Sequence, residues 1–407
     1  MIRQSNPGPA ARVGLACAGG VVEGAFYEIG ALCALSESVR GLDLNRLHAY
    51  VGVSAGAIVA AGLANGITPQ AMASAVLGIR TDGVEPLRPD MLLTPAAGEY
   101  GRRVLRVPLL LAGALGEYMA HRGDLSLAGA LSELKDALPV GFFDSRPLER
   151  YMARVLTSGG RTNDFRALRT QLRIVAVNLD TSELAVFGTP GLDHVPISRA
   201  VQASTALPVL YPPVEIDGSW YIDGVARRTL NATSALEAGA ELLFCVNPIV
   251  PVDLRKGGAP GEHLVNHGLP AVLSQTLRTL VHSRLRTAFR AYEHSHPGAD
   301  LILIEPEAED PTLFFSNLFS FSNRFHVVEY GYSSTRAFLL REAERLEPIL
   351  NRRCLSLDME VLRDPGRRLT PAEALPTVPY RRSRHPRQAL DRLDRALDRL
   401  SGVLSRN

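Results

Sequence analysis

The chain has 407 residues, 46% of them hydrophobic and 21% charged, and its formal net charge is +2. This length and composition allow a large core in one or two domains, and the nearly balanced charge gives no indication of nucleic-acid binding. No run of about 18 uncharged apolar residues occurs, which argues against a membrane-spanning helix.

A polar leader over residues 1–11 precedes the first expected strand, which begins at Val13. The strand leads into a loop that contains Gly19 and Gly20, and a helix is expected from Gly24. Backbone amides in such a loop can point at a developing oxyanion. The glycines lack the G-x-G-x-x-G spacing of a dinucleotide site and the Gly-Lys-Ser/Thr of a P-loop, so we expect no nucleotide cofactor.

The next strand ends in Gly52-Val53-Ser54-Ala55-Gly56, and an alanine-rich helix follows. A sharp turn from strand to helix presents its central serine, here Ser54, while Gly52 and Gly56 avoid side chains that would collide in the turn. The helix N-terminus directs amide groups and the positive end of its dipole toward the serine oxygen. The pattern indicates a nucleophile for acyl transfer, and the alternative is a loop of small residues that packs two elements.

Two apolar stretches outside the expected strands are candidates for contact with lipid. Residues 104–115 are rich in leucine and follow Arg102 and Arg103, as in an interfacial helix or lid. Residues 314–321 include four phenylalanines. For both stretches the alternative is packing in the core or in the wall of an acyl pocket.

Strands are expected over residues 172–179 and 184–188, followed by a hairpin over 214–222 that turns at Asp217-Gly218. The hairpin ends at Asp223, whose carboxylate therefore lies at a turn. An Asp-Gly pair alone is a weak signal, because it usually marks only a turn.

The alternation of strands and helices implies an α/β fold, a three-layer sandwich with a mainly parallel central sheet. Functional loops then lie at the carboxyl ends of the strands. A surface loop is expected at residues 257–261. The remaining elements expected are a strand over 242–246, a helix over 269–292, a strand over 301–304 and a helix over 327–350.

The last part of the chain, residues 351–407, has 13 arginines and 7 carboxylates. A proline-rich linker or strap is expected over 365–386. An amphipathic helix follows, which we expect to dock on its own domain or to form a homodimer with a second copy. Its aspartates weaken the alternative of an anionic membrane surface. The apolar positions of this helix are Leu390, Leu393, Leu397, Leu400 and Leu404.

The cysteines form no C-x-x-C pair, so neither a zinc site nor a disulfide framework is expected. No targeting segment is convincing, because cleavage in the first apolar run would remove the glycine-rich loop. We expect a cytoplasmic protein, with peripheral contact to a membrane left open. Free, buried thiols are expected at Cys17, Cys33, Cys245 and Cys354.

Taken together, the glycine-rich loop, the G-x-S-x-G turn and the Asp-Gly pair resemble the patatin-like phospholipase family. Residues 202–213, which include Ala203-Ser204 and Pro208, are similar to the run that precedes the family's aspartate. The resemblance extends over roughly residues 12–248. It implies a patatin-like catalytic core over 12–255, an α-rich continuation packed on the core over 256–350, and the tail.

The resemblance further implies a serine acyl hydrolase that acts on lipid or phospholipid esters and needs no metal or other cofactor. The implied catalytic dyad is Ser54 and Asp223, with Gly224 as the motif glycine after the acid. Gly19, Gly20 and Val21 are implied to form the oxyanion hole.

Three positions depart from the family pattern. Val21 replaces the third glycine of the loop, Glu23 replaces a basic residue, and Val225 follows Gly224 in place of glycine or alanine. Because valine resists positive φ, a different loop shape is one consequence. These departures leave a lipid-binding protein without activity as an alternative. An acyltransferase is another alternative, since only the acceptor of the acyl group differs.

A Ser-His-Asp α/β-hydrolase is a further alternative. Its histidine would follow the acid in the chain, and His326 is the best-placed candidate. Against it, such an enzyme does not place its oxyanion loop at residue 19, about 35 residues before the nucleophile.

Overall fold

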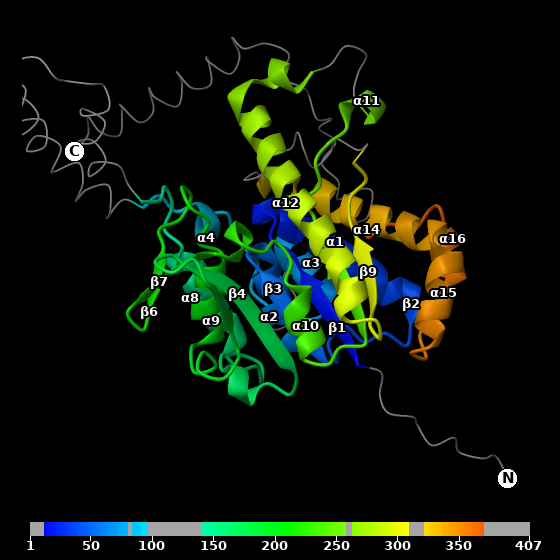
Figure 1. Cartoon of the computed structure of the whole chain (residues 1–407), viewed down its shortest axis with the longest axis horizontal. Helices are drawn as coiled ribbons and strands as arrows, with labels where there is room; N and C mark the ends of the chain where they lie inside the picture. The colour runs from blue at the N-terminus through cyan, green and yellow to red at the C-terminus, as the bar shows by residue number, and fades with distance from the viewer. Residues whose placement is uncertain (1–11, 80–83, 97–139, 258–262, 309–320, 370–407) are drawn as a thin grey trace, which may run out of the picture. The chain divides into compact units, whose positions relative to one another are not determined.

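The computed structural model describes residues 12–79, 84–96, 140–257, 263–308 and 321–369. The described residues up to Leu369 belong to one compact unit built around a sheet (Figure 1). The strand order is β6-β7-β4-β3-β1-β8-β9, and β5 pairs with β4 outside this path. The leader, residues 104–115, most of the loop at 257–261, most of 314–321 and the tail leucines lie outside the described residues.

The centre of the sheet is parallel. From β4 to β9 in the strand order, each strand is parallel to its neighbour. Three of the central strands are buried at every residue, as expected for parallel strands covered on both faces. The five strands are β1 (Val13–Cys17), β3 (Ala49–Val53), β4 (Gln171–Asn178), β8 (Leu242–Val246) and β9 (Asp300–Ile304).

The other edge of the sheet is antiparallel. Strand β4 pairs with β5 (Leu184–Phe187) and with β7 (Ser219–Asp223), and β7 forms a hairpin with β6 (Val214–Ile216). The hairpin turns at Asp217 and Gly218, which have φ of 51° and 77°, the left-handed conformation of a type I′ turn. The expected hairpin is therefore confirmed.

Helices cover both faces of the sheet, which confirms the three-layer α/β fold. Residues that alternate along β1 contribute to two separate hydrophobic clusters, because successive side chains point to opposite faces. One cluster contains residues of α1 (Val21–Ser38), α2 (Ala55–Ala64), α3 (Pro69–Leu77), α8 (Arg146–Leu156) and α9 (Ile197–Ser204). The other contains residues of α10 (Ala232–Glu237) and α12 (Gly268–Ser295).

Helix α1 is enclosed between the sheet and α14 (Arg324–Arg341). Glycines allow the two helices to approach closely. A Cβ atom at Gly30 would lie 2.0 Å from the Val328 carbonyl oxygen, and one at Gly331 would lie 2.2 Å from that of Tyr27. This close packing fixes the position of α1, whose N-terminus follows the glycine-rich loop.

The structure differs from the sequence-based predictions for two helices and one cysteine. Helix α1 begins at Val21 instead of Gly24. The helix expected over residues 327–350 is two helices, α14 and α15 (Ala343–Asn351), because Glu342 leaves the helical region with φ −93° and ψ 9°. The three other cysteines are buried as predicted, but Cys354 is exposed, because it lies in the turn after α15 with φ 57°.

The first residues of the expected tail fold onto the compact unit. Strand β10 (Ser356–Leu357) pairs with β2 (Val39–Arg40), and Asp358 accepts a 2.8 Å bond from Arg40. Asp358 also caps α16 (Met359–Arg363). The short helices α4 (Asp90–Leu93) and α11 (Leu254–Gly257) complete the described elements drawn in Figure 1. Among the described helices, none is long and apolar enough to cross a membrane.

Candidate active site

Ser54 lies between β3 and α2 in a strained conformation, with φ 54° and ψ −123°. Its amide donates a 2.8 Å hydrogen bond to Ser204 Oγ, and Ser204 Oγ donates a 2.6 Å bond to the carbonyl of Val175. Positive φ is rare in residues other than glycine, and it persists when the surrounding structure supports it. The buried Ser204 hydroxyl supplies that support by joining Ser54 to the neighbouring strand β4.

The two glycines of the turn stand where a side chain would collide with backbone. A Cβ atom at Gly52 would lie 2.5 Å from the Cα of Ala57. One at Gly56 would lie 2.4 Å from the carbonyl oxygen of Cys17, at the end of β1. The small residues therefore allow α2 to start directly above β1 and β3, as expected for a sharp turn from strand to helix.

Asp223 is the last residue of β7 and is fully buried. Its Oδ1 accepts a 2.9 Å bond from the Val225 amide, while Oδ2 has no hydrogen-bond partner among the described residues. Burial raises the pKa of Asp223 from 3.8 to about 7, and smaller effects of the Ser54 hydroxyl and the Val225 amide oppose this rise. The Ser54 hydroxyl is thus near enough to influence the carboxylate, although Oδ2 is not in an ordinary hydrogen bond.

Gly224 follows Asp223, and here the chain turns back toward Ser54. A Cβ atom there would lie 2.5 Å from the carbonyl oxygen of Val175 and 2.9 Å from a methyl carbon of Val53. A larger residue would be displaced from the end of β4, which lies between β7 and β3 in the sheet. Glycine therefore lets the turn after Asp223 approach Ser54 across an intervening strand.

The glycine-rich loop lies against the same serine. A Cβ atom at Gly19 would be 3.0 Å from Ser54 Cβ and 2.2 Å from a methyl carbon of Val225. The Gly19 amide, however, donates a 3.0 Å bond to the carbonyl of Thr229. Gly19 therefore allows close approach, but its amide is already used in this structure.

The next two amides are better candidates for oxyanion donors. Gly20 precedes α1 and Val21 is its first residue, so their amides have no acceptor within the helix. No acceptor is recorded for them elsewhere in the described part of the chain either. Of the three residues predicted to form an oxyanion hole, Gly20 and Val21 therefore remain the candidates, and the Gly19 amide is already bonded.

Val21 adopts the conformation that a glycine would favour. Its φ is 55°, and positive φ in a β-branched residue is a genuine outlier. The predicted resistance of valine to this conformation does not prevent it here. The loop keeps a glycine-like backbone and stores strain of about 1–3 kcal/mol.

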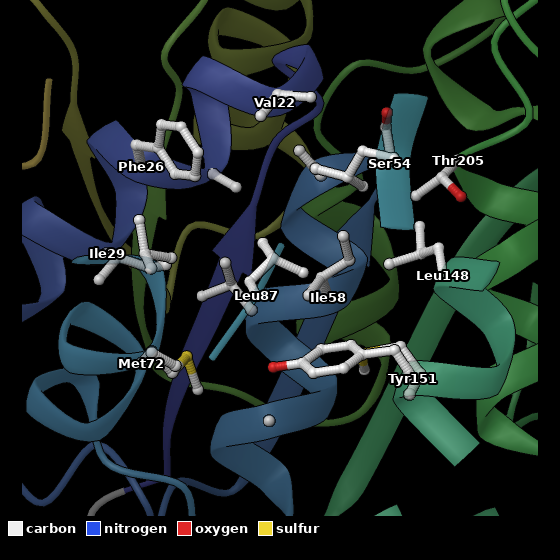
Figure 2. Close-up of a pocket in the computed structure, with 18 of the residues that line it drawn as sticks. Val22, Phe26, Ile29, Ser54, Ile58, Met72, Leu87, Leu148, Tyr151 and Thr205 are labelled. Carbon is white, nitrogen blue, oxygen red and sulfur yellow. The ribbon is translucent and has the colours of Figure 1, made fainter. Parts of the chain in front are cut away.

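An apolar cavity of about 100 Å³ lies beside Ser54. Figure 2 shows Ser54 and Thr205 on one side of the lining, with Val22 and Phe26 of α1 across from them and side chains from α2, α3 and α8 below. The Tyr151 and Tyr211 hydroxyls bond to the carbonyls of Glu85 and Leu92 at 2.9 and 2.7 Å. The labelled apolar residues include Val22, Phe26, Ile29, Ile58, Leu87 and Leu148.

Glu23 and Arg278 lie beside the glycine-rich loop. Both are buried and line a small hollow together with Gly20 and Val21. Burial lowers the pKa of Arg278 to about 10, and the charge of Glu23 opposes this. The acidic residue that replaces the family's basic residue is thus accompanied by an arginine from α12.

The histidine predicted for a triad is elsewhere. His326 is exposed on α14, which packs against α1. Among the described residues, no histidine is hydrogen-bonded to Ser54 or Asp223, and no group of three or more His, Cys, Asp or Glu residues could hold a metal ion. The described geometry therefore brings Ser54 and Asp223 together, and none of the described histidines joins them.

A family model for patatin-like phospholipases matches residues 15–236, which is more than half of the chain. The chain belongs to the patatin-like phospholipase family. The match contains the candidate residues from Gly19 to Gly224. No curated protein matches this patatin-like chain.

Among solved structures, VipD from Legionella pneumophila has 15% identity and a TM-score of 0.35, over 82% of this chain and 67% of VipD. The type III effector ExoU has 17% identity and a TM-score of 0.35, over 82% of this chain and 53% of that one. ExoU with SpcU, from Pseudomonas aeruginosa, has 18% identity and a TM-score of 0.23, over 69% and 52%. The patatin-like chain spans from about half to two thirds of these proteins.

Sequence reasoning assigned no role to Ser204 or Ala206 of this patatin-like protein. Ser204 bonds the Ser54 amide, and the carbonyl of Ala206 accepts a 3.0 Å bond from the Asp223 amide. The end of α9 therefore holds both candidate catalytic residues. The Ala-Ser-x-x-x-Pro pattern was the available signal, but its contacts depend on the tertiary fold.

Proposed function

We propose that this protein is a lipid acyl hydrolase of phospholipase type, with Ser54 as nucleophile and Asp223 as general base. The main support is the buried pair at the ends of β3 and β7. The Ser54 hydroxyl affects the Asp223 carboxylate, and Oδ2 of that carboxylate has no hydrogen-bond partner within the described part of the chain. A base with a pKa of about 7 is suited to proton transfer near neutral pH.

In the first half of the proposed reaction, Ser54 Oγ attacks the acyl carbonyl carbon while its proton passes to Asp223. The amides of Gly20 and Val21 stabilise the negative oxygen of the tetrahedral intermediate. The carbon–oxygen bond to the alcohol then breaks, and the departing oxygen takes the proton from Asp223. An acyl ester of Ser54 remains.

In the second half, water attacks the acyl ester and gives a proton to Asp223. The tetrahedral intermediate forms on the same amides and collapses, with return of the proton to Ser54 Oγ. The products are a free carboxylic acid and the regenerated enzyme. Asp223 thus acts as base and then as acid in each half.

The cavity supports an acyl group as the part of the substrate bound next to Ser54. Its lining is apolar apart from a few polar side chains, and the two tyrosine hydroxyls bond to backbone carbonyls instead of remaining free. An alkyl chain needs no hydrogen bonds, so it can occupy such a site at low cost. The head group has no comparable signal in the described residues.

The test is covalent labelling with a fluorophosphonate, followed by hydrolysis of a panel of lipid esters. We expect Ser54 to be labelled and the Ser54→Ala variant to be unlabelled. Mass analysis of the products separates a free acid from an acyl group transferred to another alcohol. Failure of folded protein to react with the probe or with any ester would favour a lipid-binding protein and contradict this proposal.

A further inference from the structure

Helix α12 has one face fixed to the compact unit. Gln275 accepts a 3.1 Å bond from the Val252 amide and donates a 2.8 Å bond to the Val252 carbonyl. Nine residues further along, Arg284 donates a 3.1 Å bond to the carbonyl of Ala226, next to the acid turn. Because nine residues are about two and a half turns, Gln275 and Arg284 lie on opposite flanks of the helix. Val281, Leu285 and Tyr292 form the face between them and are buried in the core. These contacts fix which side of α12 faces outward.

The outward side of the first half of α12 is apolar. We call it the leucine face; its members are spaced one, three or four residues apart, and this spacing places them all on one side of the helix. A contiguous group of exposed apolar residues often marks a binding surface, whereas single exposed apolar residues are common and need no explanation. Its members and exposed fractions are Leu269 70%, Val272 38%, Leu273 58%, Leu277 51% and Leu280 59%.

The charges of α12 indicate which kind of surface the leucine face binds. The helix has four arginines, at positions 278, 284, 286 and 290, and a single carboxylate, Glu293. Arg286 and Arg290 are exposed one to three turns beyond the leucine face. Leucines beside arginines, with almost no acidic residues, are typical of helices that lie on anionic lipid. A second copy would bring like charges together, which disfavours pairing through this face.

The leucine face also adjoins the candidate active site. Leu277 lines a small hollow together with Gly20 and Val21, the two candidate oxyanion donors. Figure 1 shows α12 extending from the sheet, with its N-terminal half projecting away from it. A surface bound along this half of the helix would therefore lie next to the glycine-rich loop.

We propose that the leucine face of α12 docks on the surface of a bilayer that contains anionic phospholipid. The leucines enter the boundary between head groups and acyl chains, and the exposed arginines contact the phosphates. The consequence for catalysis, which is the delivery of lipid to Ser54, rests on the proposed function. The docking itself requires no chemistry at Ser54.

The first experiment measures flotation of the full chain with vesicles of phosphatidylcholine, with and without phosphatidylserine. Leu273→Gln/Leu280→Gln should bind the anionic vesicles at least about tenfold more weakly, because two inserted leucines are lost. The matched control, Ile79→Gln/Leu340→Gln, removes two other exposed apolar residues and should bind like the wild type. Equal binding by the leucine-face variant and the control would overturn the proposal.

The arginines are tested by Arg286→Gln/Arg290→Gln. Loss of two surface charges should weaken binding to phosphatidylserine vesicles by roughly tenfold or more at low salt. The difference should shrink at high salt, since salt screens exposed charges. A loss of the same size on pure phosphatidylcholine would contradict the assigned role of the arginines.

Binding is measured in the Ser54→Ala background, so that docking and catalysis can fail separately. If the wild type hydrolyses no ester but the Ser54→Ala chain docks through the leucine face, docking stands and the proposed function is wrong. If the wild type hydrolyses a soluble ester but binding does not depend on Leu273 and Leu280, the proposed function stands and docking is wrong.

A local probe distinguishes lipid from a second copy. Thr276 and Thr287 are both exposed on the outward side of α12, and each hydroxyl bonds the carbonyl four residues earlier, at 2.8 and 3.0 Å. Each is changed to Cys in a Cys354→Ser background and labelled with an environment-sensitive fluorophore. Anionic vesicles should shift the emission to the blue at position 276 more than at 287. Equal shifts, or a shift that follows protein concentration without vesicles, would overturn the proposal.

Discussion

Ser54 and Val21 have almost the same unusual φ, 54° and 55°, but different surroundings. Each precedes or begins a helix at the carboxyl end of a central strand. The Ser54 amide is bonded to Ser204, whereas no acceptor is recorded for the Val21 amide in the described residues. The comparison indicates that the strained backbone at Ser54 orients its side chain, whereas the strained backbone at Val21 leaves its amide available.

The largest expected effect comes from removing the nucleophile. Ser54→Ala should lower turnover of a soluble ester by about 10⁴ or more, as for other serine nucleophiles. Ser54→Gly should be as inactive but more stable than Ser54→Ala by about 1 kcal/mol, because glycine accepts positive φ without strain. Ester hydrolysis and urea unfolding measure the two quantities. Equal stability of both variants would show that the elbow is not strained in solution.

Asp223 should link activity and stability to pH in opposite directions. Its native pKa of about 7 lies above the value of 3.8 for an exposed Asp, so only above about pH 7 is the native base fully ionised. We therefore expect kcat/KM to rise with pH and level off above about 7.

For stability, the native state holds this proton between about pH 4 and 7 while the unfolded state has released it. The free energy of unfolding should therefore fall as pH rises through this window, by up to about 4 kcal/mol. Asp223→Asn, which stays neutral, should be inactive and should gain stability over the wild type as pH rises from 4 to 8. Thermal unfolding at both pH values checks this. A constant difference between variant and wild type would contradict a raised pKa.

Ser204→Ala should have an intermediate effect. It removes the acceptor of the Ser54 amide and a donor to Val175, so we expect kcat to fall by about 10–100-fold as the elbow loses its geometry. The matched control is Ser198→Ala on the same helix, whose buried hydroxyl bonds to Glu149 at 2.9 Å. Both variants should lose about 1–3 kcal/mol of stability. If both lose kcat equally, Ser204 has no specific positioning role.

Much of this site could be predicted from the sequence because its signals are local. The turn at Ser54 and the Asp-Gly pair after β7 depend on short patterns of glycine and apolar residues. The position of Asp223 near Ser54 could not come from spacing, because it depends on an antiparallel return beside β4 and on the passage of Gly224 across that strand. The hydrogen bond from the Gly19 amide could not be predicted either, since its acceptor, the Thr229 carbonyl, is 210 residues away.

The helical predictions show the same limit. Periodicity predicted α12 nearly at its observed ends, but it could not tell which apolar positions would be covered. Val281 and Leu285 are buried, while Leu273 and Leu280 are exposed. Only the tertiary arrangement separates these two sets, and the proposed lipid surface depends on that separation.

The smallest expected effect is that of Val21→Gly, which separates strain from donor geometry at the second strained position. Glycine keeps the backbone amide and accepts φ of 55° without strain, so turnover should stay within about threefold of the wild type. Relief of strain of about 1–3 kcal/mol is opposed by lost burial of the half-buried valine and by the greater freedom of glycine in the unfolded chain. The net change in unfolding free energy should therefore be within about 1 kcal/mol, measured by urea unfolding beside ester hydrolysis.

Val21→Ala is the matched comparison, because it removes the β-branch but retains a Cβ at positive φ. A large loss of turnover in Val21→Gly, with normal turnover in Val21→Ala, would show that the side chain, and not the amide, is what the loop requires.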